Sequence, residues 1–440
     1  MTQKRPINAD APAAVPNAEE KAEATTAPEA APAPAAHRRG ISAVPLAIAG
    51  LALLASVFLV VAIVAGGGSD SGSSQGGGPV AGRGSEDESE GSSAGYAGNN
   101  TTRIGGDDPA TLAAAVALTV FPSRTPAQRP ASVALVGEES WQNVVAAAVM
   151  MAPPIRAPLL IAAASGLPEP TARAVTAMNP TGNKLKPAGN RSREGPQAYV
   201  FGPIATPTLR SARTGETTGA VQAAEIEAIR NGVFRGPPKH VIVASETEPA
   251  FAAPAAAWAA RSGDTVLYAH RNKLPAPTRD LLERFPNVPV YVLGPPSVIS
   301  TAVLDEISKL VKRVKRVGGP TPAENAIALA RYSDGSFGWN VNDPGHGFVI
   351  ARSSEPLSAA LAAPLSASGT WGPMLLTESA DKLPKSVREY LLDVKPGYTT
   401  DPTRAFYNHV WVIGETEAID VNQQAEIDQL AELAKVKGEG

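Results

Sequence analysis

One pattern recurs three times along the chain at a nearly constant interval. Short apolar segments at Val133–Val136, Val241–Ala244 and Phe348–Ala351 begin roughly 108 residues apart. Each copy closes with a second apolar segment that ends in Gly, at Ala198–Gly202, Val290–Gly294 and Val410–Gly414. A short β-rich run followed by Gly and a helix is typical of a parallel strand that leads into a tight turn. The repeat therefore predicts an α/β fold that is built three times.

A short motif of Arg and Gly, called the seam here, separates the copies. It reads Arg-Val-Gly-Gly at 316–319 and Arg-Ile-Gly-Gly at 103–106, and a weaker version stands at 213–215. After the last seam, Thr321-Pro322-Ala323-Glu324 has the pattern of a capping box that opens a helix. The seams predict three repeat modules with short parallel sheets, at residues 103–212, 213–315 and 316–440.

The first hundred residues predict three further segments. Residues 1–40 are rich in Ala, Pro and Glu and hold few large apolar side chains, so we expect a disordered tail. Residues 41–65 carry no charge. As a helix at ~1.5 Å per residue they would span roughly 37 Å, enough for a transmembrane signal anchor. Residues 66–102 are rich in Gly and Ser, which is typical of a flexible linker.

The charges beside the apolar segment predict its orientation. Arg38 and Arg39 precede it, and acidic residues such as Asp70 and Glu86 follow it. Positive charge stays on the cytoplasmic side. We therefore expect a single-pass protein of the cell membrane whose carboxy-terminal region lies outside the cell, in the wall. Two other interpretations are a cleaved signal peptide, which would be shorter and nearer the amino terminus, and a buried core helix.

Composition and missing motifs exclude several classes of function. The chain has no Cys, which excludes disulfides, thiolate metal sites and Cys nucleophiles. Its net charge of −3 does not indicate a nucleic-acid partner. Residues 103–440 contain no Walker-type phosphate loop, no Gly-x-Ser-x-Gly elbow and no His-Glu-x-x-His. His346 and Asp343 are too few for a metal site and fit a Pro-Gly turn. We therefore expect no enzymatic activity, no catalytic residue, no metal and no cofactor.

Two groups of polar residues have both a binding and a structural interpretation. Thr377, Glu378 and Ser379 follow an apolar strand, where open α/β sheets place ligands, although the same side chains could cap the next helix. Lys312 and Arg316 could contact phosphate or carboxylate groups, or they could complement the dipole of the preceding helix. We include Thr377 and Arg316 among the candidate binding residues.

The order of these motifs resembles the cell-wall-binding repeat 2 family, whose modules occur in threes on the surface of Gram-positive bacteria. The Ala-rich helix at Ser358–Leu365, the Pro-led strand at Pro373–Thr377 and the closing strand at Trp411–Gly414 match the family's motifs in order. The resemblance covers about residues 103–440. In the second copy, Asp264 and Thr265 replace the Pro-led start of the strand.

The resemblance implies three Toprim-like modules in an intramolecular pseudo-trimer that bind an anionic wall polymer or peptidoglycan non-covalently. The polymer-binding residues that it implies lie in the first and third modules: Pro158, Leu159, Leu160, Pro373, Met374, Leu375, Leu376 and Thr377. Two other functions are a protein-interaction scaffold of the envelope with the same fold and no polymer binding, and a cell-envelope hydrolase.

Overall fold

The computed structural model describes residues 97–185, 194–205, 207–215 and 217–436, which all belong to one compact unit. The predicted tail at 1–40, the predicted membrane span at 41–65 and nearly all of the predicted linker at 66–102 lie outside these residues. Within the described ranges, no helix is both long enough and apolar enough to cross a membrane. The predicted fold class is corrected accordingly, because no membrane-spanning helix stands among the elements of the described residues.

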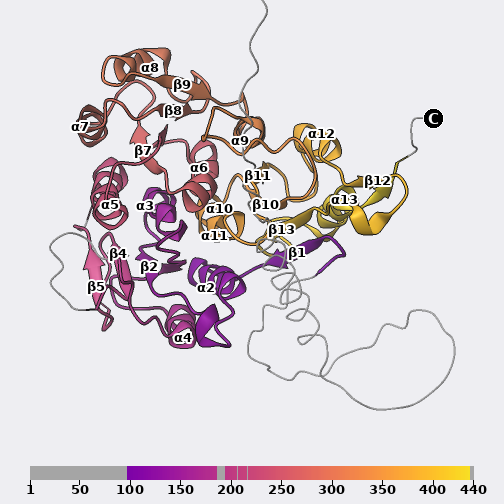
Figure 1. Ribbon diagram of the computed structural model, residues 1–440, viewed down its shortest axis with the longest axis horizontal. Coiled ribbons are helices and arrows are strands. Elements are labelled where there is room, and N and C mark those ends of the chain that lie inside the picture. The colour runs from indigo at the N-terminus through magenta and orange to yellow at the C-terminus, as the bar shows by residue number, and fades with distance from the viewer. Residues whose placement is uncertain (1–96, 186–193, 206, 216, 437–440) are drawn as a thin grey trace, which may run out of the picture. The chain divides into compact units, whose positions relative to one another are not determined.

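Three four-stranded parallel sheets form the framework (Figure 1). The first has the order β3 (Leu159–Ile161), β2 (Val133–Val136), β4 (Ala198–Phe201) and β5 (Ser211–Arg213). The second has the order β7 (Thr265–Ala269), β6 (Val241–Ser245), β8 (Val290–Leu293) and β9 (Val314–Val317). The third has the order β1 (Thr101–Ile104), β13 (His409–Ile413), β10 (Gly347–Arg352) and β11 (Met374–Thr377). The predicted α/β class with short parallel sheets is confirmed.

Helices connect the strands and cover the sheets. The longer ones are α2 (Pro109–Val120), α4 (Glu169–Met178), α5 (Gly219–Phe234), α6 (Pro249–Ser262), α7 (Ala276–Arg284), α8 (Thr301–Ser308), α9 (Pro322–Arg331), α12 (Lys385–Asp393) and α13 (Val421–Ala431). The shorter ones are α3 (Trp141–Ala147), α10 (Pro356–Leu361), α11 (Ala363–Ser366) and the 3-10 turns η1 (Pro126–Gln128), η2 (Ala148–Met151) and η3 (Pro402–Arg404). A two-stranded parallel pair, β12 (Gly397–Tyr398) with β14 (Ala434–Lys435), completes the described elements.

Local sequence signals explain where the helices begin. At α9, the Thr321 side chain accepts from the Glu324 backbone N–H at 3.2 Å, and the Glu324 carboxylate accepts from the Thr321 backbone N–H at 3.2 Å. The predicted capping box is confirmed. At α2, Asp108 caps the helix by accepting from the backbone N–H of Thr111 at 2.8 Å. Both caps satisfy N–H groups that a helix start leaves without partners.

The Ala-rich helices pack against one another in the interior. All residues of α6 from Ala252 to Ala260 are buried, so this helix is enclosed on every side. It contacts α3 and α10, which follow the first strand of their own copies as α6 does, and α3 and α10 also contact each other. Figure 1 shows α6 among α3, α10 and α11. Small side chains let three helix backbones approach closely, which explains the Ala composition. The predicted pseudo-trimer of modules stays a prediction.

The seam strands and the helices that follow them belong to different sheets. Strand β5 hydrogen-bonds to β4 of the first sheet, whereas α5 packs on β7 of the second. Strand β9 pairs with β8 of the second sheet, whereas α9 packs on β11 of the third. Strand β1 pairs with β13 of the third sheet, whereas α2 packs on β3 of the first. The seams thus link the three sheets in a closed circuit, and the predicted boundaries near 212 and 316 fall inside β5 and β9.

Candidate functional site

The residues that the family resemblance implies as polymer-binding lie in the sheets. Pro158 directly precedes β3, and Leu159 and Leu160 belong to that strand. Met374 to Thr377 form β11, with Pro373 directly before it. All of these side chains are buried, and Leu159, Leu160, Leu375 and Leu376 are 0% exposed. Their packing role in the sheets is evident, and their role as polymer ligands stays a prediction.

Arg316 has partners in the protein. Its guanidinium donates to the main-chain oxygens of Gly294 at 2.7 Å and Ser300 at 3.3 Å. The other seam arginines act in the same way: Arg103 donates to the oxygen of Gly414 at 2.8 Å, and Arg213 donates to the oxygen of Ile204 at 2.9 Å. Each seam arginine therefore holds the loop that follows the closing strand of its sheet. Burial lowers the pKa of Arg316 below its ordinary value.

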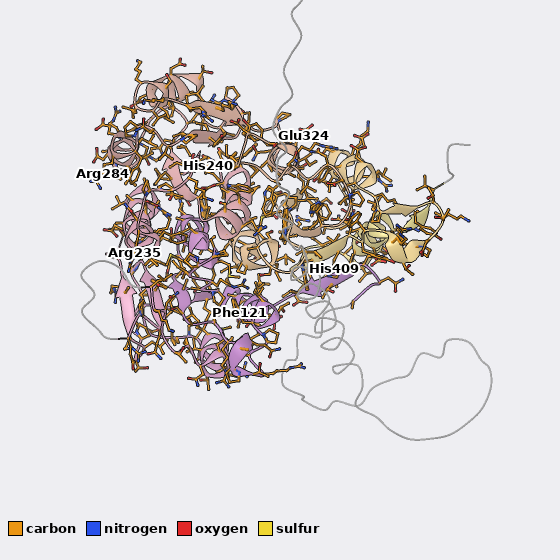
Figure 2. The ribbon with its side chains drawn as sticks, viewed as in Figure 1. Phe121, Arg235, His240, Arg284, Glu324 and His409 are labelled. Atoms are coloured by element: carbon orange, nitrogen blue, oxygen red, sulfur yellow. The ribbon has the colours of Figure 1, made fainter. Side chains whose placement is uncertain are left out.

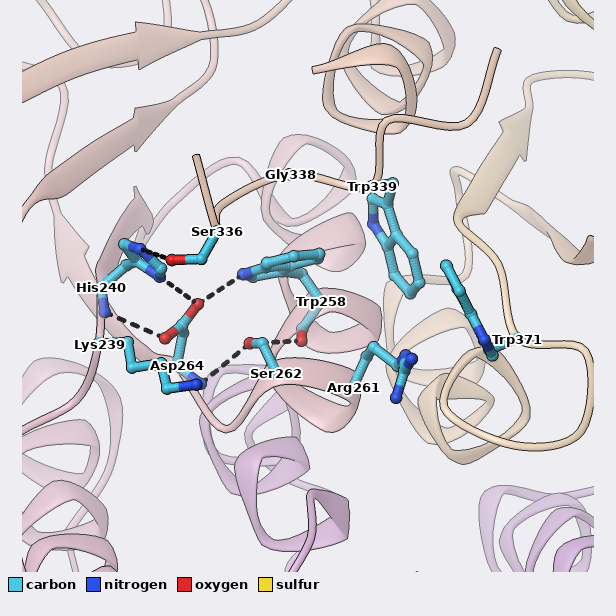
Figure 3. A pocket seen from close by; sticks show the side chains of 10 residues that line it. All are labelled: Lys239, His240, Trp258, Arg261, Ser262, Asp264, Ser336, Gly338, Trp339 and Trp371. Carbon is cyan, nitrogen blue, oxygen red and sulfur yellow. Dashed lines mark hydrogen bonds and ion pairs between the residues drawn. The ribbon is translucent and has the colours of Figure 1, made fainter. Parts of the chain in front are cut away.

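A cavity of ≈ 300 Å³ opens where the second and third copies meet (Figure 3). One side is formed by the end of α6 and the residues next to it, including His240 before β6 and Asp264 before β7. The other side is formed by the loop between α9 and β10, which carries Ser336, and by Trp371 before β11. The cavity is thus assembled from segments that are far apart in the sequence.

A buried polar network forms one wall of the cavity. The Asp264 carboxylate accepts from the backbone N–H of His240 at 3.0 Å and from the Trp258 indole N–H at 2.8 Å. Its Oδ2 also lies 2.9 Å from His240 Nδ1. The backbone N–H of Asp264 donates to Ser262 Oγ at 3.0 Å. Every charge-bearing atom of this buried acid therefore has a partner, as a buried carboxylate requires.

Ser336 extends the network into the cavity. Its Oγ lies 3.1 Å from His240 Nε2. In Figure 3, the Ser336 side chain meets one edge of the imidazole, and Asp264 meets another. The result is a line of three groups in which a serine contacts a histidine and the histidine contacts an aspartate. This order is the arrangement of an activated nucleophile, its base and the group that orients the base.

Two cationic side chains line the same cavity. Lys239 is exposed, and Arg261 lies with its guanidinium carbon 4.5 Å from the centre of the Trp371 ring. Burial lowers the pKa of Arg261 below its ordinary value. Neither side chain forms an ion pair with another described residue, and Asp264 is the only carboxylate in the lining. Because both carboxylate oxygens of Asp264 already accept hydrogen bonds from His240 and Trp258, the charge that a ligand can reach in the cavity is positive.

Aromatic rings hold the walls in place. Trp258 meets Trp339 edge to face at a centroid distance of 5.3 Å, and Trp339 stacks beside Trp371 at 6.1 Å. Phe337 stacks on Tyr291 at 3.6 Å with an interplanar angle of 1°. Aromatic pairs of this kind stabilise by about 0.5–1.5 kcal/mol each beyond their buried area. The loop that carries Ser336 is therefore fixed to the second copy.

Sequence reasoning did not identify this site, because its residues come from three separate segments. His240 and Asp264 are 24 residues apart, and Ser336 is 96 residues from His240. One signal was present: Asp264 stands where the third copy has the Pro-led start of its strand. That replacement supplies the carboxylate of the network. Nothing in the sequence pattern indicates that the loop after α9 reaches it.

The fold defines a protein of repeated parallel α/β modules, and comparison with known proteins finds solved structures with a similar fold. No protein-family model matches the sequence, and no curated protein matches it either. The solved structure of Cwp6 from Clostridium difficile is similar with a TM-score of 0.59 and 16% identity, over 76% of this chain and 48% of that one. Cwp8 from Clostridium difficile is similar with a TM-score of 0.50 and 17% identity, over 76% and 52%. The chain thus spans about half the length of these structures, and the likeness shows a shared fold.

Proposed function

We propose that the protein is a cell-wall-associated binding protein of the cell surface that attaches non-covalently to an anionic wall polymer. The proposal draws on the fold, because Cwp6 and Cwp8 are cell-wall proteins. It also draws on the order of sequence motifs that resembles the cell-wall-binding repeat 2 family. The single observation that carries it is the cavity between the second and third copies, whose accessible charge is positive. Binding of this kind requires no catalysis and no cofactor.

The cations of the cavity suit phosphate or carboxylate groups. Arg keeps its charge even when its pKa is lowered, and its planar guanidinium can donate two hydrogen bonds to one anionic group. Partial burial of Arg261 strengthens its attraction to an anion, because the surroundings screen charge less than water does. Lys239 adds a second positive charge at the exposed side of the same cavity. A polymer with repeated anionic groups can therefore bind there through charge-assisted contacts, each worth about 1.5–3 kcal/mol.

The first test is binding of the full-length chain to isolated cell walls at low salt, before and after the anionic polymers are stripped from the walls. We expect binding that stripping removes and added salt weakens, because exposed charges are screened. The double variant Lys239→Ala with Arg261→Ala should bind at least about tenfold more weakly. Thermal unfolding of each variant checks that it is folded.

The matched control removes one Arg and one Lys elsewhere in the second copy. Arg284, on α7, and Lys309, after α8, are exposed and lie outside the cavity lining (Figure 2). Arg284→Ala with Lys309→Ala changes the net charge equally and should leave binding nearly unchanged. Equal losses in the two double variants would contradict binding at the cavity. If the parent chain does not bind cell walls at all, the result would favour the protein-interaction scaffold.

A further inference from the structure

We propose that Ser336, His240 and Asp264 form a catalytic serine site that hydrolyses short acyl esters carried by an anionic polymer. The substrate class rests on the proposed polymer binding, whereas the catalytic arrangement rests on geometry alone. The proposal departs from the expectation that the chain is not an enzyme. That expectation depended on linear motifs, and a site assembled from three segments has none.

The two distances of the site match those of a nucleophile and its base. Ser336 Oγ lies 3.1 Å from His240 Nε2, and His240 Nδ1 lies 2.9 Å from Asp264 Oδ2. Both fall in the range of about 2.6–3.2 Å at which a base accepts the proton of a nucleophile. Ser336 is exposed to the cavity, while His240 is 6% exposed and Asp264 is 1% exposed. The nucleophile is therefore accessible, and the groups behind it are shielded from water.

Asp264 determines which nitrogen of His240 carries the proton. An ionised carboxylate only accepts hydrogen bonds. The proton of the neutral ring therefore lies on Nδ1, which faces Asp264, and the lone pair on Nε2 faces Ser336. Trp258 and the His240 backbone N–H hold the carboxylate in place. Asp264 thus acts as a positioning residue for a base that is ready to accept the Ser336 proton.

Ser336 occupies a rigid turn. The backbone N–H of Asp334 donates to the Phe337 oxygen at 2.9 Å, and the Phe337 N–H donates to the Asp334 oxygen at 3.2 Å. Asp334 also accepts from the Tyr291 hydroxyl and from the Lys315 ammonium, each at 2.8 Å. Sites held on such rigid supports keep the geometry that catalysis needs.

Gly338 supplies a donor beside the nucleophile. It lines the cavity with a φ of +99°, and a side chain there would meet the Tyr332 main-chain oxygen at 2.2 Å, so only Gly fits. Its backbone N–H makes no hydrogen bond within the described part of the chain. It can therefore donate to the oxyanion that forms when a serine attacks a carbonyl.

The cavity sets the size and charge of the substrate. Its volume of ≈ 300 Å³ lies at the lower end of small-molecule sites, which suits a short acyl group. Lys239 and Arg261 line the same space and favour an alcohol part that carries phosphate or carboxylate. Short acyl esters on an anionic polymer satisfy both conditions.

The reaction proceeds in two steps with water as the co-reactant. Ser336 Oγ forms a bond to the ester carbonyl carbon while its proton passes to His240 Nε2. The bond to the alcohol oxygen breaks, and His240 returns the proton to the leaving alcohol. Water then attacks the acyl-serine, His240 takes a proton from it, and the proton returns to Ser336 as the acid leaves. The sum is ester plus water giving acid plus alcohol.

The test uses the full-length chain with a fluorophosphonate probe, which reacts covalently with activated serines, and with p-nitrophenyl acetate as a neutral ester. We expect one label per chain, located on Ser336 by peptide mass spectrometry, and ester turnover that Ser336→Ala abolishes. His240→Gln should lower turnover by about 10²–10⁴-fold. Asp264→Asn should lower kcat with little change in KM, which a purely structural role would not produce.

The matched control is Ser333→Ala, because Ser333 is an exposed serine of the same loop. This variant should react with the fluorophosphonate probe and hydrolyse p-nitrophenyl acetate as the parent does. Thermal unfolding of every variant separates loss of chemistry from loss of folding. The proposal is overturned if the folded parent takes up no label, or if Ser336→Ala labels as the parent does. If the parent binds walls but takes up no label, the esterase proposal alone is overturned. If Ser336 is labelled but the parent does not bind walls, the anionic polymer is overturned as the substrate.

Discussion

Guanidinium groups at the seams of this protein bind main-chain oxygens. Arg316 reaches from β9 to the loop after β8, where Gly294 and Ser300 provide acceptors. A buried main-chain acceptor without a donor is costly, and the Arg316 guanidinium supplies donors to both oxygens, of which that of Ser300 also accepts from the backbone N–H of Leu304 at 3.2 Å. The seam arginine therefore stabilises the turn that each closing strand leads into.

Arg316→Ala should lower the free energy of unfolding by about 1–3 kcal/mol, because hydrogen bonds from a charged donor are lost. The neighbouring Lys315→Ala is the control, since the Lys315 side chain forms a solvent-accessible ion pair with Asp334, and its loss should lower the free energy of unfolding much less. Urea unfolding of both variants measures the difference. Equal effects at the two positions would contradict the structural role of Arg316.

His409 makes stability depend on pH. Burial lowers its pKa to about 4, although the charge of Asp428 acts in the opposite direction. The unfolded chain has the ordinary histidine pKa of about 6.5, so between these values it binds more protons than the folded chain does. The contribution of His409 is present above about pH 6.5 and is lost as the pH falls through about 4.

Between about pH 7 and about pH 4.5, the parent should therefore lose about 2–3 kcal/mol more stability than the variant His409→Gln. Urea unfolding of both chains at these two pH values provides the measurement. The two chains should show the same pH dependence between about pH 7 and pH 9, where the histidine is neutral in both states. Parallel losses on acidification would show that His409 does not titrate as described.

At the scale of elements, strand β1 is joined to the sheet that lies farthest from it in the sequence. Its residue Thr102 pairs with Trp411 in β13. Adjacent strands lie about 4.7–4.9 Å apart, within the range of Cα separations that a disulfide spans. The chain has no Cys of its own, so an introduced pair has no competitor.

The variant Thr102→Cys with Trp411→Cys should form an intramolecular disulfide on mild oxidation, visible by mass spectrometry of unreduced peptides. Thr102→Cys with Tyr199→Cys is the control, because Tyr199 belongs to β4 of the first sheet. A cross-link in the control and none in the first pair would contradict the assignment of β1 to the third sheet.

Sequence patterns predicted the elements better than their partners. The strands β2, β6 and β10 and the cap at Thr321 follow from local periodicity and helix-start signals, which depend on neighbouring residues. The assignment of β1 to β13 depends on residues about 310 positions apart, which no local signal encodes. The same holds for His240, Asp264 and Ser336, whose proximity is a product of the fold. Arg316 is a predicted binding residue because its charge can be read from the sequence, whereas its main-chain partners cannot.

At the scale of the whole molecule, the closed circuit through the seams determines when the fold can be completed. Strand β1 is synthesised early, but its partner β13 emerges only after some 300 further residues. Holding such distant ends together costs about 5 kcal/mol of chain entropy when the intervening residues are unstructured, and much less once two sheets have formed. The third sheet is therefore the last to close. Until then the edge of β13 has no partner strand, and β1 of a neighbouring chain can pair with it in place of β1 of the same chain. Nascent chains at high local concentration can therefore form domain-swapped dimers that exchange β1.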